Sequence, residues 1–160
     1  VEHSSIGQRF LEAGDETSSV NTRLTVWRSV APKLVENPVM GFGTGTFIFV
    51  QSLQTSPGDP VLEAHNDYLK LAVENGWPAA LLYLTVWLLW LTLGIKYWKK
   101  SDEKDKQLLA GLLLVLAIVF PIVSLVDNVL RATAVMWLLW LVIGMILGIH
   151  KYPLLGQGSK

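Results

Sequence analysis

The sequence predicts an all-α, polytopic integral membrane protein, in which a mostly helical outward region precedes three transmembrane helices. Hydrophobic residues make up 51% of the 160 residues. Three stretches, residues 77–95, 107–126 and 132–149, contain no Asp, Glu, Lys or Arg. Each stretch falls within the range of about 17–25 apolar residues that an α-helix needs to cross a bilayer. This distribution excludes a soluble globular domain.

The composition also excludes several kinds of site. The chain has no Cys, which excludes disulfide frameworks, zinc ribbons and thiol chemistry. Its three histidines, His3, His65 and His150, are far apart and form no paired metal motif, so we predict no metal site and no cofactor. The formal net charge is +0 and there is no basic run, so no nucleic-acid partner is predicted. Because the chain begins with Val1 and shows no signal peptide, we interpret it as the C-terminal part of a longer protein.

The three apolar stretches define the expected membrane-spanning helices. With their flanking residues they are 76–97, 107–126 and 132–150. Pro78 suits the first turn of the first span, and Pro121 should kink the second span near its end. The joint at 127–131 is short, so the second and third spans should form an antiparallel hairpin.

The distribution of Lys predicts the orientation in the membrane. Residues 96–106 hold five Lys, and the tail at 151–160 adds two more. Because cytoplasmic loops carry an excess of Lys and Arg, we expect residues 98–106 and the tail to be cytoplasmic. Residues 1–75 and the joint at 127–131 then lie on the extracytoplasmic side.

The first part of the outward region should be a loop followed by a helix. Residues 1–20 are polar and rich in Ser, and we expect an exposed loop. From Thr22 the spacing indicates one helical face, formed by Arg23, Trp27, Val30 and Leu34. Pro32 should divide this amphipathic helix into two pieces, and Asn37 before Pro38 should end it.

The second part of the outward region should be a glycine turn followed by another helix. Gly41, Gly43 and Gly45 resemble a phosphate-binding pattern, but no strand precedes them, and we expect a tight turn with a close backbone approach. A helix over residues 61–75 should start after Asp59-Pro60 and end at Gly76. It should carry on one face His65, Tyr68, Leu69 and Ala72.

Two further patterns concern the spans. The first is an aromatic stripe on the first span, which consists of Tyr83, Trp87 and Trp90. We interpret it as a surface for lipid contact or for packing between helices, rather than as a groove for an isoprenoid chain.

The second pattern is in the joint, where Asp127 and Arg131 are four residues apart, a spacing that favours a local ion pair. An alternative function is a non-catalytic membrane transport or accessory subunit that uses these two residues as an intramembrane relay. Their place at a span end disfavours that alternative.

Three motifs occur in a fixed order. They are Arg23-x3-Trp27, then Asn37-Pro38-x2-Gly41-x-Gly43, and then His65-Asn66-x9-Gly76. Together they resemble the O-antigen ligase and O-antigen polymerase superfamily of bacterial envelope glycan assembly. The resemblance covers residues 20–95, whereas the second and third spans are similar only in kind.

The resemblance implies a glycosyltransferase of the bacterial inner membrane. Such an enzyme moves a glycan from an undecaprenyl-diphosphate carrier to an acceptor hydroxyl, without a nucleotide and without a metal. In a ligase the acceptor is a sugar of the lipid A core. The sequence leaves open a polymerase, whose acceptor is another carrier-linked chain, and a related ligase that glycosylates protein.

The resemblance also implies roles for particular residues. His65 is the candidate catalytic base, since an imidazole, the side chain that most often acts as a general base, can take a proton from a hydroxyl. Arg23 and Arg28 are the candidates for binding the diphosphate, which a guanidinium can pair with in bidentate fashion. The expected supporting residues are Trp27, Gly41, Gly43, Asn66, Gly76 and Asp127.

Overall fold

The structure, a computed structural model, describes residues 16–53 and 63–151. Over these ranges it is helical and contains no strand; the elements are α2 (Glu16–Val30), α3 (Lys33–Glu36), α4 (Phe47–Ser52), α5 (Asp67–Asn75), α6 (Trp77–Lys100), α7 (Lys104–Val123), the 3-10 turn η1 (Val129–Arg131) and α8 (Thr133–Lys151). The expectations for residues 1–15, for Asp59-Pro60 and for the tail beyond residue 151 lie outside the described residues. All-α architecture is confirmed.

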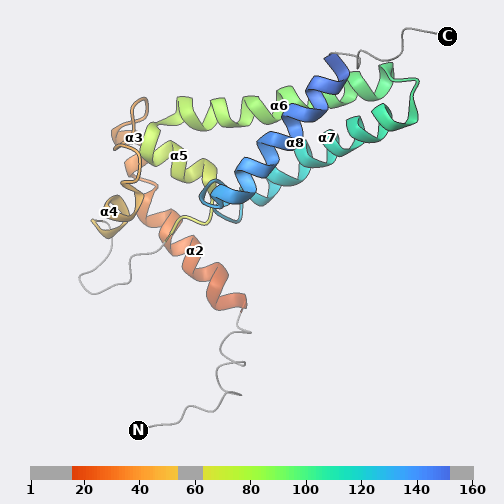
Figure 1. Cartoon of the computed structure of the whole chain (residues 1–160). Coiled ribbons are helices and arrows are strands. Elements are labelled where there is room, and N and C mark those ends of the chain that lie inside the picture. Colours follow the sequence, from red (N-terminus) through yellow and green to blue (C-terminus); the bar gives the residue numbers. More distant parts are fainter. Residues whose placement is uncertain (1–15, 54–62, 152–160) are drawn as a thin grey trace, which may run out of the picture.

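Helices α6, α7 and α8 are each long and apolar enough to cross a membrane. The chain is therefore a multi-pass membrane protein with three such helices among its described residues. Figure 1 shows α6 and α7 side by side, with α8 crossing the pair at an angle. Helix α7 ends at Val123, three residues before the expected end of the span, because the next residues form tight turn hydrogen bonds from the backbone N–H groups of Leu125 and Val126.

An aromatic cluster fills the interface between the spans. Trp87 is 2% exposed, meets Trp90 edge-on at 5.1 Å, and stacks on Phe120 of α7 at 5.8 Å between ring centroids. Trp90 also meets Trp140 of α8 at 4.7 Å. Each such aromatic pair contributes about 0.5–1.5 kcal/mol beyond its buried area. Of the two roles favoured for the aromatic stripe, packing between helices is therefore the one that Trp87 and Trp90 have.

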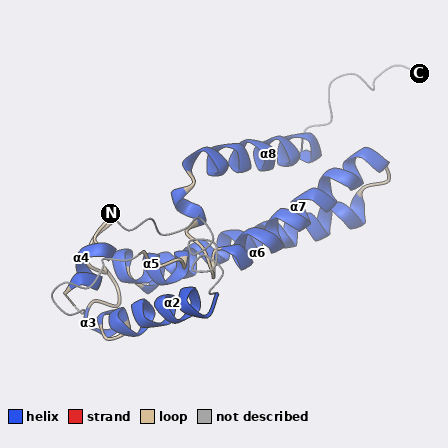
Figure 2. Cartoon of the chain, turned by 90° about the horizontal axis from the view of Figure 1, so that it is seen from below, coloured by secondary structure: helices blue, strands red, loops and turns tan. Residues whose placement is uncertain are grey.

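The N-terminal helices form a second core at one end of the α6–α7 pair (Figure 2). It is made of Val26, Val30, Phe47, Val50, Ala64 and Val73. Burial of one such Val or Phe side chain contributes roughly 1.5–3 kcal/mol. Helix α2 already begins at Glu16, so the expected loop over residues 1–20 is wrong for residues 16–20. The break between α2 and α3 around Pro32 is as predicted.

The glycine turn caps the end of α5. Gly41, Gly43 and Gly45 all have positive φ, and a β-carbon on Gly41 would collide with the backbone of Glu74. The N–H of Phe42 donates to Val73 O at 2.9 Å, and the N–H of Gly43 donates to Glu74 O at 2.7 Å. These bonds satisfy carbonyls that the last turn of a helix leaves without a partner. The predicted tight turn with a close backbone approach is confirmed.

Gly76 ends α5 as predicted. Its φ of 80° and ψ of 170° lie in a region that is essentially restricted to glycine. A β-carbon there would collide with the carbonyl of Val39, and the neighbouring N–H of Trp77 donates to Pro38 O at 2.8 Å. The glycine turn and the start of α6 are thereby held together.

The start of α5 differs from the prediction. The helix begins at Asp67, not at residue 61, because Asn66 has extended backbone angles and acts as the N-cap. The Asn66 side chain accepts a hydrogen bond from the N–H of Leu69 at 2.9 Å. His65 therefore precedes the helix, and its expected place on a helix face with Tyr68 and Ala72 is wrong.

Candidate functional site

The N-terminus of α5 meets the C-terminus of α7. The N–H of Asp67 donates to Ser124 O at 2.8 Å, which pairs a donor of the first turn of one helix with a carbonyl at the end of the other. The hydroxyl of Tyr68 donates to Pro121 O at 3.3 Å. Burial is the main cause that raises the pKa of Tyr68 to about 12. This hydroxyl therefore stays protonated and able to donate. These contacts place His65 beside the joint between α7 and α8.

His65 contacts Asp127 of this joint. Its Nδ1 lies 3.5 Å from Oδ1 of Asp127, and the two side chains are 44% and 64% exposed. The same Oδ1 accepts a hydrogen bond from the N–H of Asn128 at 2.7 Å, which fixes the carboxylate. His65 has a φ of 44° and is the one non-glycine residue with positive φ in the described ranges. Such backbone strain is concentrated at functional sites.

Arg23 reaches the same joint from α2. Its Nη1 donates to Val126 O at 3.0 Å, one residue before Asp127. A guanidinium carries five N–H donors, and this bond uses one of them. Within the described residues the others have no partner, so they can bind an anion.

Trp27 and Arg28 follow Arg23 on α2 and differ from each other. The indole Nε1 of Trp27 donates to Ala64 O at 2.7 Å and so fixes the backbone just before His65. Arg28 is exposed, and no residue in the described ranges is its hydrogen-bond or ion-pair partner. The structure thus brings Arg23 and Trp27 to the site, and gives Arg28 no contact there.

Glu63 and Arg131 form a neighbouring ion pair that the sequence analysis missed. Nη1 of Arg131 lies 2.7 Å from Oε1 of Glu63, and Nζ of Lys70 lies 3.8 Å from its Oε2. The expected local pair between Asp127 and Arg131 is wrong, because each side chain has a partner from the segment just before α5, His65 for Asp127 and Glu63 for Arg131.

The family of the protein follows from a match over the first half of its sequence. The family model for O-antigen ligases matches residues 2–84, more than half of the chain. The chain belongs to the O-antigen ligase family. No curated protein and no solved structure matches it.

The matched part of this O-antigen ligase family member includes Arg23, Trp27, the glycine turn and His65. Asp127 lies beyond it. The structure therefore adds a carboxylate from the joint to residues that the family model covers.

Asp67 is a second carboxylate of this O-antigen ligase family member that the sequence analysis missed. It is 1% exposed, its Oδ2 accepts a hydrogen bond from the N–H of Leu130 at 3.2 Å, and its Oδ1 has no hydrogen-bond partner among the described groups. Burial raises the pKa of Asp67, while the Leu130 N–H, the nearby Ser124 hydroxyl and the charge of Lys70 offset part of the rise. Asp67 therefore ties α5 to η1 and positions the joint.

An apolar cavity of about 250 Å³ adjoins the site. It lies among α7, the joint and the start of α8, and Asp127 is the one charged residue that lines it within the described part of the chain. The other lining residues are Val119, Phe120, Val123, Asn128, Val129, Ala132 and Val135. An apolar chain fits such a lining, and a group attached to it would lie near the joint that Arg23 contacts. Among the described residues, no group of three or more His, Cys, Asp or Glu is placed to hold a metal ion.

Proposed function

We propose that the protein is a ligase-type glycosyltransferase, which moves a glycan from an undecaprenyl-diphosphate carrier to a hydroxyl of a lipid A core sugar. Its membership of the O-antigen ligase family supports this class of function. One observation carries the proposal. Arg23 and His65, from separate segments, contact the consecutive residues Val126 and Asp127. A cation and a candidate base thus lie at one exposed place, at the end of the membrane helices.

In the proposed reaction, His65 is the general base. Its Nδ1 faces Asp127, so Nε2 is the atom that takes the proton of the acceptor hydroxyl. The hydroxyl oxygen then forms a bond to the anomeric carbon of the donor sugar. The bond from that carbon to the diphosphate breaks, and its electron pair leaves with undecaprenyl diphosphate. Asp127 stabilises the imidazolium that forms.

Arg23 is proposed to bind the diphosphate of the donor. Negative charge builds up on the departing oxygen, and fixed positive charge beside it lowers the barrier. The free N–H groups of the guanidinium can pair with two phosphate oxygens at once. The apolar cavity next to Asp127 would accept the first part of the isoprenoid chain. The reaction proposed in this way requires no metal.

We also propose that this site faces the periplasm. Seven Lys lie at the other end of the membrane helices or in the tail that follows them. Since Lys marks the cytoplasmic side, the joint lies on the periplasmic side of the bacterial inner membrane. The structure does not favour a transport relay, because the side chains of Asp127 and Arg131 are 64% and 67% exposed at the joint, outside the membrane-spanning helices.

The test of the Arg23 assignment is glycan transfer by the full-length protein in membranes, with the parent and the variants Arg23→Ala, Arg23→Lys and Arg28→Ala at matched expression. Arg23→Ala should lower the rate by about 10²–10³-fold and weaken donor binding. Arg23→Lys should restore only part of the rate, because an ammonium lacks the bidentate fork. Arg28→Ala should cost less than Arg23→Ala, since Arg28 has no contact with the joint.

Two outcomes would contradict the proposed clamp. One is an Arg23→Ala rate equal to that of the parent. The other is loss of transfer by the parent on addition of a chelator, which would assign the charge to a metal instead.

A further inference from the structure

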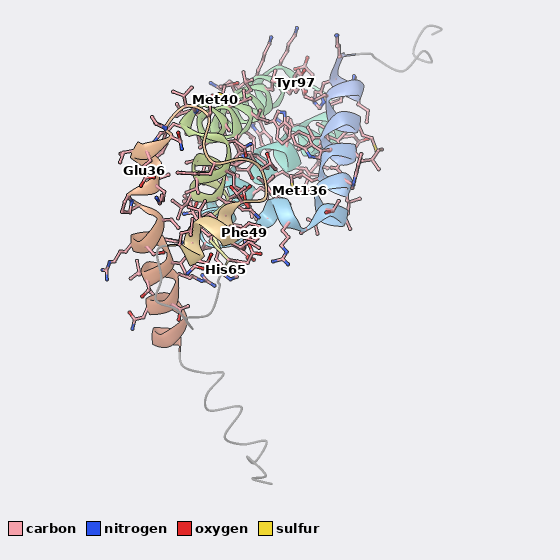
Figure 3. The ribbon with its side chains drawn as sticks, turned by 90° about the vertical axis from the view of Figure 1, so that its left-hand side faces the viewer. Glu36, Met40, Phe49, His65, Tyr97 and Met136 are labelled. Carbon is pink, nitrogen blue, oxygen red and sulfur yellow. The ribbon has the colours of Figure 1, made fainter. Side chains whose placement is uncertain are left out.

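A cavity of about 370 Å³ lies at the opposite end of the membrane helices from His65. In Figure 3, Tyr97, which lines this cavity, is labelled near the top of the view, and His65 is labelled well below it. All three spans contribute basic side chains to it. They are Lys96 and Lys100 of α6, Lys106 of α7, and His150 and Lys151 of α8.

The cavity carries a positive charge. Its lining has four Lys against two acids, Asp102 and Glu103, a net charge of 4 − 2 = +2 with neutral His. Glu103 is already paired with Lys106 at 2.8 Å. Within the described residues, Lys96 and Lys100 have no hydrogen-bond or ion-pair partner. Two ammonium groups are therefore available to an anion.

His150 forms a fixed wall of this cavity. Its ring stacks on Tyr97 at 4.4 Å between centroids. Its Nδ1 lies 2.9 Å from Ile146 O, and its Nε2 lies 3.0 Å from Lys106 O. Both partners are carbonyl oxygens, so both contacts are hydrogen bonds only when both ring nitrogens carry a proton.

We propose that this cavity binds a phosphate-bearing anion, and that its source is the headgroup of an anionic phospholipid. The cavity lies between the ends of three helices whose outer faces are apolar, with exposed side chains such as Ile95, Trp98 and Met145. A lipid can place its phosphate among the lysines while its acyl chains lie along these faces. Basic pockets between transmembrane helices bind lipid headgroups in this way. The bound lipid would hold the ends of α6, α7 and α8 together, next to the short loop that joins α6 to α7.

The alternative explanation is that these lysines only mark the cytoplasmic side of the membrane. Matched variants separate the two explanations. Lys96→Gln/Lys100→Gln removes two charges from the cavity, and Lys99→Gln/Lys104→Gln removes two exposed charges that do not line it. Both pairs lower the net charge of the protein by the same amount.

The test is native mass spectrometry of the full-length protein in a neutral detergent, with added diphosphatidylglycerol or phosphatidylcholine. We expect selective binding of the anionic lipid by the parent. Affinity should fall about tenfold or more in the cavity pair and by less than about twofold in the control pair. Equal losses in both pairs, or no preference for the anionic lipid, would overturn the proposal. If the cavity pair fails to reach the membrane, Lys100→Gln alone should lower affinity by about threefold.

A second arm distinguishes the two sources of phosphate. Inorganic phosphate is added to the parent and to both pairs of variants, with and without lipid. The lipid proposal expects phosphate to displace lipid only weakly, because it lacks the apolar contacts. Binding of phosphate that depends on Lys96 and Lys100, without lipid binding, would assign the cavity to a soluble anion and overturn its assignment to lipid.

Discussion

Nδ1 of His65 lies 3.5 Å from Oδ1 of Asp127, although one residue precedes α5 and the other follows α7. Three hydrogen bonds between distant segments hold this arrangement. They run from Trp27 to Ala64 O, from the Asp67 N–H to Ser124 O, and from Arg23 to Val126 O. The pair is therefore a product of the tertiary fold, and each of these contacts can be tested for its effect on the site.

Asp127→Asn should lower the rate of transfer more than it weakens donor binding. The amide retains the shape of the carboxylate but no longer stabilises a charged imidazolium. We expect kcat to fall by about tenfold to 10²-fold, less than on removal of a general base, with little change in the KM for the donor. Steady-state kinetics of the full-length protein in membranes measure both. An Asp127→Asn variant with the kcat of the parent would show that the pair does not take part in the reaction.

Asp67 should make stability depend on pH. Burial raises the pKa of Asp67 above its ordinary value of 3.8. Between the ordinary pKa and the raised folded pKa, the folded protein binds more protons than the unfolded chain does, so stability falls as the pH rises through this window. Below the ordinary pKa both states are protonated, and the loss disappears. Above the folded pKa, the loss is constant.

Asp67→Asn should remove this dependence without loss of the fold. The amide oxygen can still accept the hydrogen bond from the N–H of Leu130, and no charge is buried. Asp67→Leu should instead destabilise the protein by about 1–3 kcal/mol, because it leaves that partly buried N–H without its partner. Thermal unfolding in detergent, from about pH 4 to pH 8, measures both variants. An identical pH slope for the parent and for Asp67→Asn would assign the dependence to another group.

Gly76→Ala should damage folding at the end of α5. The glycine-only backbone conformation alone costs about 1–3 kcal/mol for an alanine, and the new β-carbon would also collide with the carbonyl of Val39. Gly144→Ala is the control, because a β-carbon at Gly144, inside α8, would meet no described atom within 4 Å beyond its chain neighbours and the nearby backbone of its own helix. Folded yield by size-exclusion chromatography in mild detergent compares the two. Equal yields would mean that the turn at Gly76 relaxes without cost.

The architecture of the membrane part could be predicted from the sequence because apolar stretches of this length without charged residues form few structures other than transmembrane helices. The three expected spans are present, and their ends differ from the predicted ends by one to three residues. Pro32, Gly41 and Gly76 were also informative, because proline and glycine act on the backbone locally. The helix over residues 61–75 was predicted too long because its start was assigned to Asp59-Pro60, although Asn66 is also a residue favoured at N-caps and is the one that caps the helix.

The site could be predicted only in part. His65, Arg23 and Asp127 were each singled out, but nothing in their spacing shows that they meet. Asp127 and Arg131 were expected to pair because they are four residues apart, yet the turn after α7 separates them and remote partners take their place. Asp67 was missed because burial of a carboxylate depends on the end of α7, far along the chain. Its one local signal was its position directly after the capping residue Asn66.

The proposed topology predicts opposite labelling of two exposed positions. The 160 residues contain no Cys, so a cysteine introduced at Val20 or at Lys99 is the one residue among them that a maleimide can label. Both positions are exposed. In intact spheroplasts, an impermeant maleimide should label the Val20→Cys variant and leave Lys99→Cys unlabelled, while both should react after lysis. The reverse pattern in intact cells would place the site on the cytoplasmic side and contradict the proposed use of a periplasmic donor.

Glycan transfer by His65→Ala, at expression matched to that of the parent, tests the role of the His65 site most directly. The measurement uses the full-length protein in membranes, with a carrier-linked glycan and an acceptor, and records the rate and the KM for the donor. Loss of a general base typically costs about 10²–10⁴-fold in rate, so we expect a decrease of that size with little change in donor KM. Transfer by His65→Ala at the rate of the parent would contradict the assignment of His65 as the base.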